Sequence, residues 1–164
     1  MTRKEYNNAV QEFSDSLFGY ALKFLRDSEE ANDAVQDSFE KLWKNRKKVD
    51  YDKAKSWLFT TAHNSMVNWV TKNNRMRPTK ESDLDTRAHE DFGYENRELI
   101  EKVLATLPSI QKSVVLFRDL EGYSYREISQ MLDLSESQVK VYLFRARKKM
   151  KKQLKELNVL AWAE

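Results

Sequence analysis

A chain of 164 residues with 40% hydrophobic and 12% aromatic side chains is long enough to bury one core or two small ones. It contains no Cys and only two His, which excludes disulfides, thiolate catalysis and zinc sites built from these residue types. The 29 basic and 26 acidic residues nearly balance, and with no apolar run long enough to span a bilayer we expect a cytoplasmic protein without membrane insertion. Only 3 Gly and 2 Pro favour an all-α fold over strands and tight turns.

Two helices are predicted at the start of the chain. Apolar residues recur every three or four positions from about Arg3 to Leu25, and Asp27 with Glu30 marks a second helix that runs to about Lys44. The second helix carries an acidic face opposite its apolar one: Asp33, Gln36, Asp37 and Glu40. Acids in the first turn favour the helix dipole, but the last two lie beyond that turn, so we predict a dedicated acidic surface for a partner.

A third predicted helix, from about Lys53 to Lys72, contains no acidic residue. Its core stripe is expected to be Leu58, Ala62, Met66 and Trp69. The other side carries neutral hydrogen-bonding groups, cations and one indole: Lys53, Trp57, Thr60, Thr61, Asn64, Asn68, Lys72 and Arg75. Cations hold phosphates, amides read base edges and an aromatic ring stacks on bases, so this face suits nucleic acid. His63 falls toward the flank of the helix and is interpreted as a surface or packing residue.

Residues 77–93 lose helical periodicity and carry more acids than bases, which indicates a flexible acidic linker. We therefore expect two small helical domains, 1–76 and 94–164. Helix signals return at Tyr94, and Pro108 starts a further helix that Gly122 ends.

The segment from Ser124 to Lys152 predicts a helix-turn-helix. Ser124 with Glu127, and Ser135 with Gln138, each fit the spacing of a capping box, and Asp133 and Leu134 lie between the two predicted helices. In the second helix a stripe of Val139, Leu143, Ala146 and Met150 faces the core. The opposite face presents Ser137, Lys140, Val141, Phe144, Arg145 and Lys148. From Ser137 to Lys155 bases recur without an acid, which is typical of DNA contact in the major groove.

The order of these parts resembles the extracytoplasmic-function group of sigma factors, the two-domain promoter-recognition subunits of bacterial RNA polymerase. The resemblance rests on DAVQDSFEKLW (33–43), KSWLFTTAHNSMVNW (55–69) and the long motif LPSIQ to RARKKM (107–150). It implies a sigma2-like domain, a linker and a sigma4-like helix-turn-helix domain, with core polymerase and promoter DNA as partners and no catalysis or cofactor.

The resemblance also implies roles for the three predicted faces. The acidic helix would dock the clamp helices of the largest polymerase subunit, the helix 53–72 would read and open DNA near the start site, and the helix from Ser137 would read the upstream element. Val141 departs from the polar residue common in similar helices, which implies weak upstream readout. An anti-sigma inhibitor and an additional DNA-targeting recruitment factor are further partners that the resemblance suggests.

Two other functions compete with this interpretation. A helix-turn-helix regulator that never joins polymerase would leave the acid-free polar helix unexplained. A metal-dependent nucleotide hydrolase would place magnesium on Asp33, Asp37 and Glu40. Such a site needs carboxylates from a facing helix, and the helix 53–72 has none, so we expect no metal site.

Overall fold

The computed structural model describes residues 1–76 and 92–156. In chain order the elements are α1 (Arg3–Leu25), α2 (Ser28–Lys44), a short 3-10 turn η1 (Tyr51–Lys53), α3 (Ala54–Met76), α4 (Phe92–Ala105), α5 (Ser109–Val115), a π-helical turn η3 (Leu116–Leu120), α6 (Tyr125–Leu132) and α7 (Glu136–Glu156). Neither described range contains a strand, so the prediction of an all-α fold is confirmed. Most of the predicted linker, residues 77–91, and the tail with Trp162 lie outside the described residues.

Side chains next to the helix ends set where several helices begin. The Thr2 hydroxyl accepts the Glu5 N–H at the start of α1, and the Glu5 carboxylate accepts the Thr2 N–H in return. At α2 the Asp27 carboxylate accepts the Glu30 N–H over 3.0 Å. These bonds satisfy amides that have no partner inside the helix.

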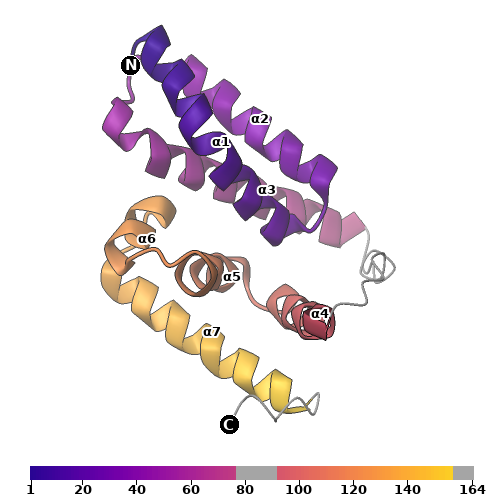
Figure 1. The fold of residues 1–164 in the computed structure, drawn as a ribbon. Coiled ribbons are helices and arrows are strands. Elements are labelled where there is room, and N and C mark those ends of the chain that lie inside the picture. The colour runs from indigo at the N-terminus through magenta and orange to yellow at the C-terminus, as the bar shows by residue number, and fades with distance from the viewer. Residues whose placement is uncertain (77–91, 157–164) are drawn as a thin grey trace.

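Helices α1, α2 and α3 pack on one another and form the first half of the molecule (Figure 1). The apolar stripe of each helix points into the space between them, where Leu17, Phe24, Leu42, Leu58 and Met66 are almost fully buried. Burying a side chain of this size contributes roughly 1.5–3 kcal/mol, so this cluster is the main source of stability in the first half.

Helices α4 to α7 form the second half, in which α7 packs across α5, α6 and α4. Between α5 and α6 the chain reverses at Gly122, whose positive φ of 79° suits a residue without a Cβ. The Tyr123 N–H then donates to the Phe117 carbonyl oxygen over 3.0 Å. Ile128 and Val139 are fully buried, which holds α6 and α7 in helix-turn-helix geometry.

The two halves share a packed interface. Helix α6 lies against α3, and η3 lies against α1, an arrangement that Figure 1 shows with α5 and α6 facing α3. Buried side chains of both halves belong to one continuous hydrophobic cluster. The division at 77–93 remains a prediction about domain boundaries, because the two sides pack against each other in this structure.

Candidate nucleic-acid interface

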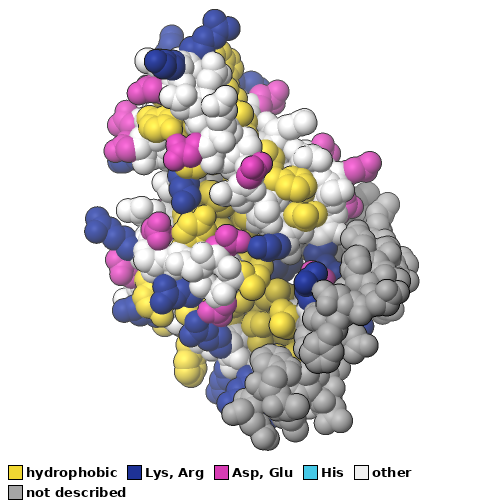
Figure 2. Space-filling view, viewed as in Figure 1, with side chains coloured by type: hydrophobic (Ala, Val, Ile, Leu, Met, Phe, Trp, Pro, Cys, Tyr) yellow, Lys and Arg dark blue, Asp and Glu magenta, His cyan; other side chains and the backbone are white. Residues whose placement is uncertain are grey.

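Helix α7 turns the predicted recognition face to the solvent. It begins with reciprocal hydrogen bonds between Ser135 and Gln138, 3.0 and 2.9 Å long, and Val139, Leu143 and Ala146 are buried as expected. The exposed side chains are the predicted set: Ser137, Lys140, Val141, Phe144, Arg145 and Lys148. Phe144 is 68% exposed and Val141 45% exposed. Dark-blue Lys and Arg side chains lie along this part of the molecule in Figure 2.

Two cations share one aromatic ring beside this face. The Lys140 ammonium lies 5.4 Å from the centroid of the Tyr125 ring, and the Arg118 guanidinium lies 4.4 Å from it. Cation–π contacts of this kind contribute about 0.5–1 kcal/mol at exposed sites. Tyr125 therefore helps to position Lys140, which the sequence placed on the recognition face.

Helix α3 presents its polar face less openly than the sequence predicts. Asn64, Asn68, Lys53 and Lys72 are exposed, whereas Thr60 and Thr61 are half-buried. The Thr60 hydroxyl donates to the Met131 carbonyl oxygen of α6 over 2.8 Å. The side chain of Arg75 lies outside the described residues.

Trp57 lies between two hollows in the surface. One is lined by the preceding segment, with Asn45, Lys48, Val49, Asp50 and Lys53. The other is lined by Lys53, Ser56, Thr60 and Thr61 of the first half and by Gln130 and Asp133 of the helix-turn-helix. The indole is half-buried and packs against the core cluster, so it is anchored at one side and open to a ligand at another.

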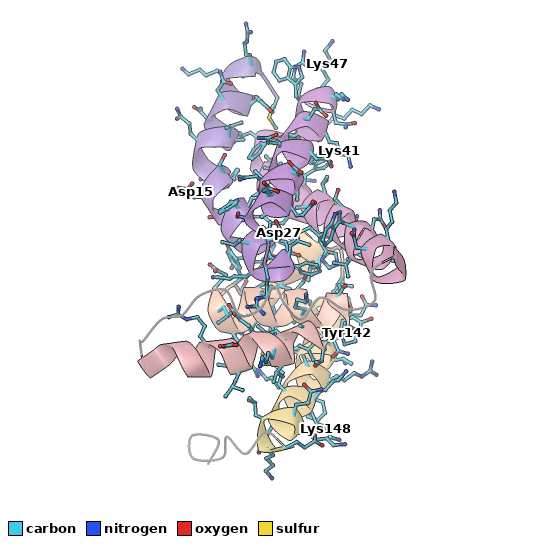
Figure 3. All side chains as sticks on the ribbon, turned by 90° about the vertical axis from the view of Figure 1, so that its right-hand side faces the viewer. Asp15, Asp27, Lys41, Lys47, Tyr142 and Lys148 are labelled. Carbon is cyan, nitrogen blue, oxygen red and sulfur yellow. The ribbon has the colours of Figure 1, made fainter. Side chains whose placement is uncertain are left out.

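The acidic face of α2 is exposed, but two of its carboxylates have partners within the helix. Lys41 pairs with Asp37 at 3.0 Å and Lys44 with Glu40 at 4.0 Å, and the Ser65 hydroxyl of α3 donates to Asp37 over 3.3 Å. Exposed pairs at this spacing are worth only about 0.3–0.5 kcal/mol. A cationic partner can therefore displace them at small cost. Figure 3 shows Lys41 on the upper half and Tyr142 and Lys148 of α7 on the lower half.

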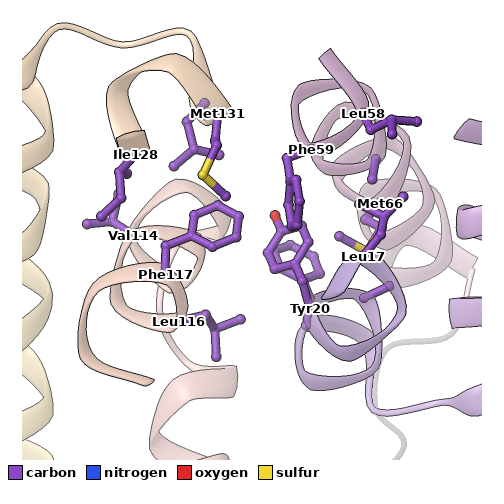
Figure 4. Packing of buried hydrophobic residues seen from close by; sticks show 14 of the residues in the cluster. Leu17, Tyr20, Leu58, Phe59, Met66, Val114, Leu116, Phe117, Ile128 and Met131 are labelled. Atoms are coloured by element: carbon purple, nitrogen blue, oxygen red, sulfur yellow. The ribbon is translucent and has the colours of Figure 1, made fainter. Parts of the chain in front are cut away.

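Three buried polar side chains meet where the halves join, and this cluster was not predicted. The Tyr20 hydroxyl lies 3.0 Å from His63 Nδ1 and 2.7 Å from the Ser113 hydroxyl, which lies 2.9 Å from the same nitrogen. All three residues are buried. Figure 4 shows Tyr20 and Phe59 facing Phe117 across the interface. We refer to Tyr20, His63 and Ser113 as the polar cluster.

Burial also changes the ionisation of this region. It lowers the pKa of His63 to about 4 and raises that of Tyr20, so both side chains are neutral near pH 7. Nearby, the Lys112 ammonium donates to the Phe24 carbonyl oxygen over 2.9 Å, and its pKa is lowered to about 8, first by burial and then by the charge of Arg26. A packing role for His63 agrees with one of the two interpretations from the sequence.

Two family models match the chain along most of its described length. The model described as Sigma-70 region 2 matches residues 9–76, which cover α1 to α3, and the model described as Sigma-70, region 4 matches residues 97–150, which cover the helix-turn-helix. The chain is an extracytoplasmic-function sigma factor of the sigma-70 family. As a sigma factor it joins core RNA polymerase and directs promoter recognition and transcription initiation.

Curated relatives of this sigma factor have the same length and order of parts. It is 26% identical over 150 residues to the ECF RNA polymerase sigma factor SigM of Bacillus subtilis, with 86% of this chain and 90% of that protein covered. It is 24% identical over 171 residues to the ECF RNA polymerase sigma-E factor of Haemophilus influenzae, with 94% and 90% covered.

A solved structure supports the fold of the sigma factor. The sigma factor RpoE of Bartonella quintana, crystallised with the anti-sigma factor NepR, gives a TM-score of 0.69 at 22% identity, with 93% of this chain and 98% of that chain covered. In the part of the sigma factor that the structure describes, no helix is long and apolar enough to cross a membrane. Within residues 1–76 and 92–156, no group of three or more His, Asp or Glu is placed to hold a metal ion.

Proposed function

We propose that three surfaces of this sigma factor divide the work of initiation. The acidic face of α2, with Asp33, Gln36, Asp37 and Glu40, docks core polymerase. The polar face of α3, with Trp57, follows and opens DNA near the start site. The exposed face of α7 contacts the upstream promoter element, and the protein carries out no catalysis itself.

The observation that carries this proposal is the position of Phe144. A ring that is 68% exposed in the middle of a basic helix face has no role in the core, and leaving it in water is unfavourable. Thymine methyl groups accept apolar contact in the major groove, while the cations beside it suit phosphates. The same helix buries Leu143 and Ala146 on its other side, so the exposed face is free to enter a groove.

The α2 surface is assigned to polymerase by its charge and shape. Its four residues are spaced at i, i+3, i+4 and i+7, and hence lie on one side of the helix. The weak intrahelical pairs leave the carboxylates exchangeable. A basic protein helix or groove fits this surface, whereas DNA phosphates would be repelled.

We also propose that an anti-sigma protein restrains this chain in the cytoplasm, because the similar sigma factors RpoE and CnrH were each solved with an anti-sigma protein or a cytosolic domain bound. A separate DNA-targeting factor would complement upstream readout that relies on Val141 and Phe144.

Reconstitution with bacterial core polymerase tests the proposal directly. We expect a stable complex that starts transcripts at a defined set of promoters, identified by sequencing the transcripts from fragmented genomic DNA. A protein that binds DNA but never forms the complex would instead be a regulator that acts without polymerase.

A further inference from the structure

The polar face of α3 is partly covered by the helix-turn-helix of the same chain. The Thr60 hydroxyl is bonded to the Met131 carbonyl oxygen, and Gln130 and Asp133 close one side of the hollow beside Trp57. The Lys55 ammonium lies 4.5 Å from the centroid of the Tyr123 ring on the other half. DNA that follows α3 as proposed above would need the space that α6 and the turn occupy.

The contacts that hold this closed arrangement combine apolar and polar groups. Phe117 packs against Tyr20 at 4.4 Å and against Phe59 at 5.5 Å between ring centroids. At the rim, Lys23 pairs with Glu121 at 2.8 Å and Arg26 with Glu101 at 2.7 Å. Interfaces between separable domains are typically more polar than a permanent core.

The polar cluster lies at the centre of this interface, and its chemistry suits an interface that can open. Its hydrogen bonds satisfy groups that would be costly to bury without partners. When the halves separate, water satisfies the same groups, whereas an apolar contact of equal size would expose hydrophobic surface. The cluster therefore gives the closed state a defined geometry without making it permanent.

We propose that the helix-turn-helix is the occupant of the α3 polar face in the free protein, so that promoter DNA reaches α3 only after the two halves separate. The strength of closure is set by the polar cluster of Tyr20, His63 and Ser113. This inference rests on the proposed DNA-contacting role of α3 and adds an intramolecular competitor for the same surface.

The absence of Cys from the sequence allows a direct test with introduced thiols. Ser56→Cys and Gln130→Cys place one thiol on each half, both lining the hollow beside Trp57, and neither residue belongs to the proposed DNA-contacting set. A short thiol-specific crosslinker with an internal disulfide would bridge them and hold the halves together. Reduction then cuts the bridge but leaves both adducts in place.

We expect the bridged protein, mixed with core polymerase, to form at least about tenfold fewer open promoter complexes than the same sample after reduction. Equal numbers before and after reduction would overturn the proposal. If the protein without crosslinker also fails to open any promoter, the proposed function fails instead, and the rate of bridging described next still tests closure.

The rate of bridging in the free protein needs no polymerase. We expect Ser113→Ala to slow it severalfold, because the loss of a buried hydrogen bond shifts the halves toward separation. Ser38→Ala is the matched control: Ser38 is equally buried, but its hydroxyl donates to the Ala34 carbonyl oxygen within α2. Bridging that is equally fast in the Ser113 variant would show that the cluster does not set closure, and would overturn that part of the proposal.

Discussion

The hydroxyl of Tyr20 lies 2.7 Å from the hydroxyl of Ser113, 93 residues farther along the chain. Both hydroxyls also contact Nδ1 of His63. The contact joins α1, α3 and α5, and so links the half that matches region 2 to the half that matches region 4. Its removal should affect stability and the exposure of α3 together.

Tyr20→Phe should lower the free energy of unfolding by about 1–3 kcal/mol, because it leaves buried partners unsatisfied. The ring itself, which packs against Phe117 and Phe59, is retained. Urea denaturation followed by circular dichroism measures the change. Tyr6→Phe is the matched control: it removes a hydroxyl that donates to Phe39 O within the first half, so it should not alter the rate at which thiols at positions 56 and 130 are bridged. An unchanged unfolding free energy in Tyr20→Phe would contradict the prediction.

The closed state should weaken in mild acid because of His63. Its pKa is about 4 in the closed state, against an ordinary value near 6.5 once exposed. The stabilisation is therefore complete above about pH 6.5 and is lost as the pH falls toward 4, up to about 3 kcal/mol at 1.36 kcal/mol per unit. The groups that face His63 do not titrate in this range: burial raises the pKa of Tyr20 on α1, Ser113 on α5 is uncharged, and Lys112, across the Phe24 ring, has a pKa of about 8.

The measurement is the unfolding free energy at pH 7 and pH 4.5 for the natural protein and for His63→Gln. Glutamine retains hydrogen-bonding capacity but cannot take up a proton, so the variant should lose less stability between the two pH values. Carboxylates titrate equally in both proteins and cancel in the difference. Identical losses would assign the acid sensitivity to other groups.

Reversing Asp37 and Glu40 together to Lys should weaken binding to core polymerase by tenfold or more. The intrahelical pairs that are lost contribute little stability, so helical content should be unchanged. Fluorescence anisotropy of labelled protein with core polymerase measures the affinity. Asp15→Lys, an exposed charge reversal on α1, is the control and should bind normally. Normal affinity in the double variant would remove the α2 face from the docking surface.

Trp57→Ala should impair DNA opening more than initial promoter binding. Stacking of a base on an aromatic ring is worth about 1–3 kcal/mol, and the half-buried indole borders two hollows on the surface. Promoter binding and permanganate-reactive thymines are scored separately in the reconstituted holoenzyme. Trp57→Tyr retains a stacking ring and should restore much of the opening. If thymines become reactive as readily with Ala as with Trp, the indole serves packing alone.

Phe144→Ala and Arg145→Ala should each weaken binding to promoters that carry the upstream element, with a loss of about 1–3 kcal/mol where the side chain reads a base. Lys148→Ala should instead weaken binding at all sequences and reduce the salt slope by about 1. Because Phe144 is largely exposed, its removal should leave the unfolding free energy unchanged. Lys102→Ala, an exposed cation on α4, is the control. Unchanged promoter affinity in all three variants would remove α7 from the DNA interface.

Local signals in the sequence were sufficient for the helices and their inward faces. Capping by Asp27, Ser124 and Ser135 depends on residues three positions apart, and the spacing of Leu58, Ala62 and Met66 places them on one side of α3, where all three are buried. Trp69, predicted on the same stripe, is only half-buried because it lies beyond the crossing of the helices. The exposed face of α7 followed from the same periodicity.

The relation between the two halves came only from the tertiary structure. Phe59 and His63 are buried although they lie off the predicted stripe of α3, because residues from 113 to 123 pack against this second side of the helix. Thr60 was predicted to face DNA and instead bonds to Met131, 71 residues away. A helix buried on two sides has no simple apolar period, and the partner of its second side is set by long-range packing. The sequence by itself determined the helices and the charge of their faces, whereas the packing of one half on the other decided which face is covered.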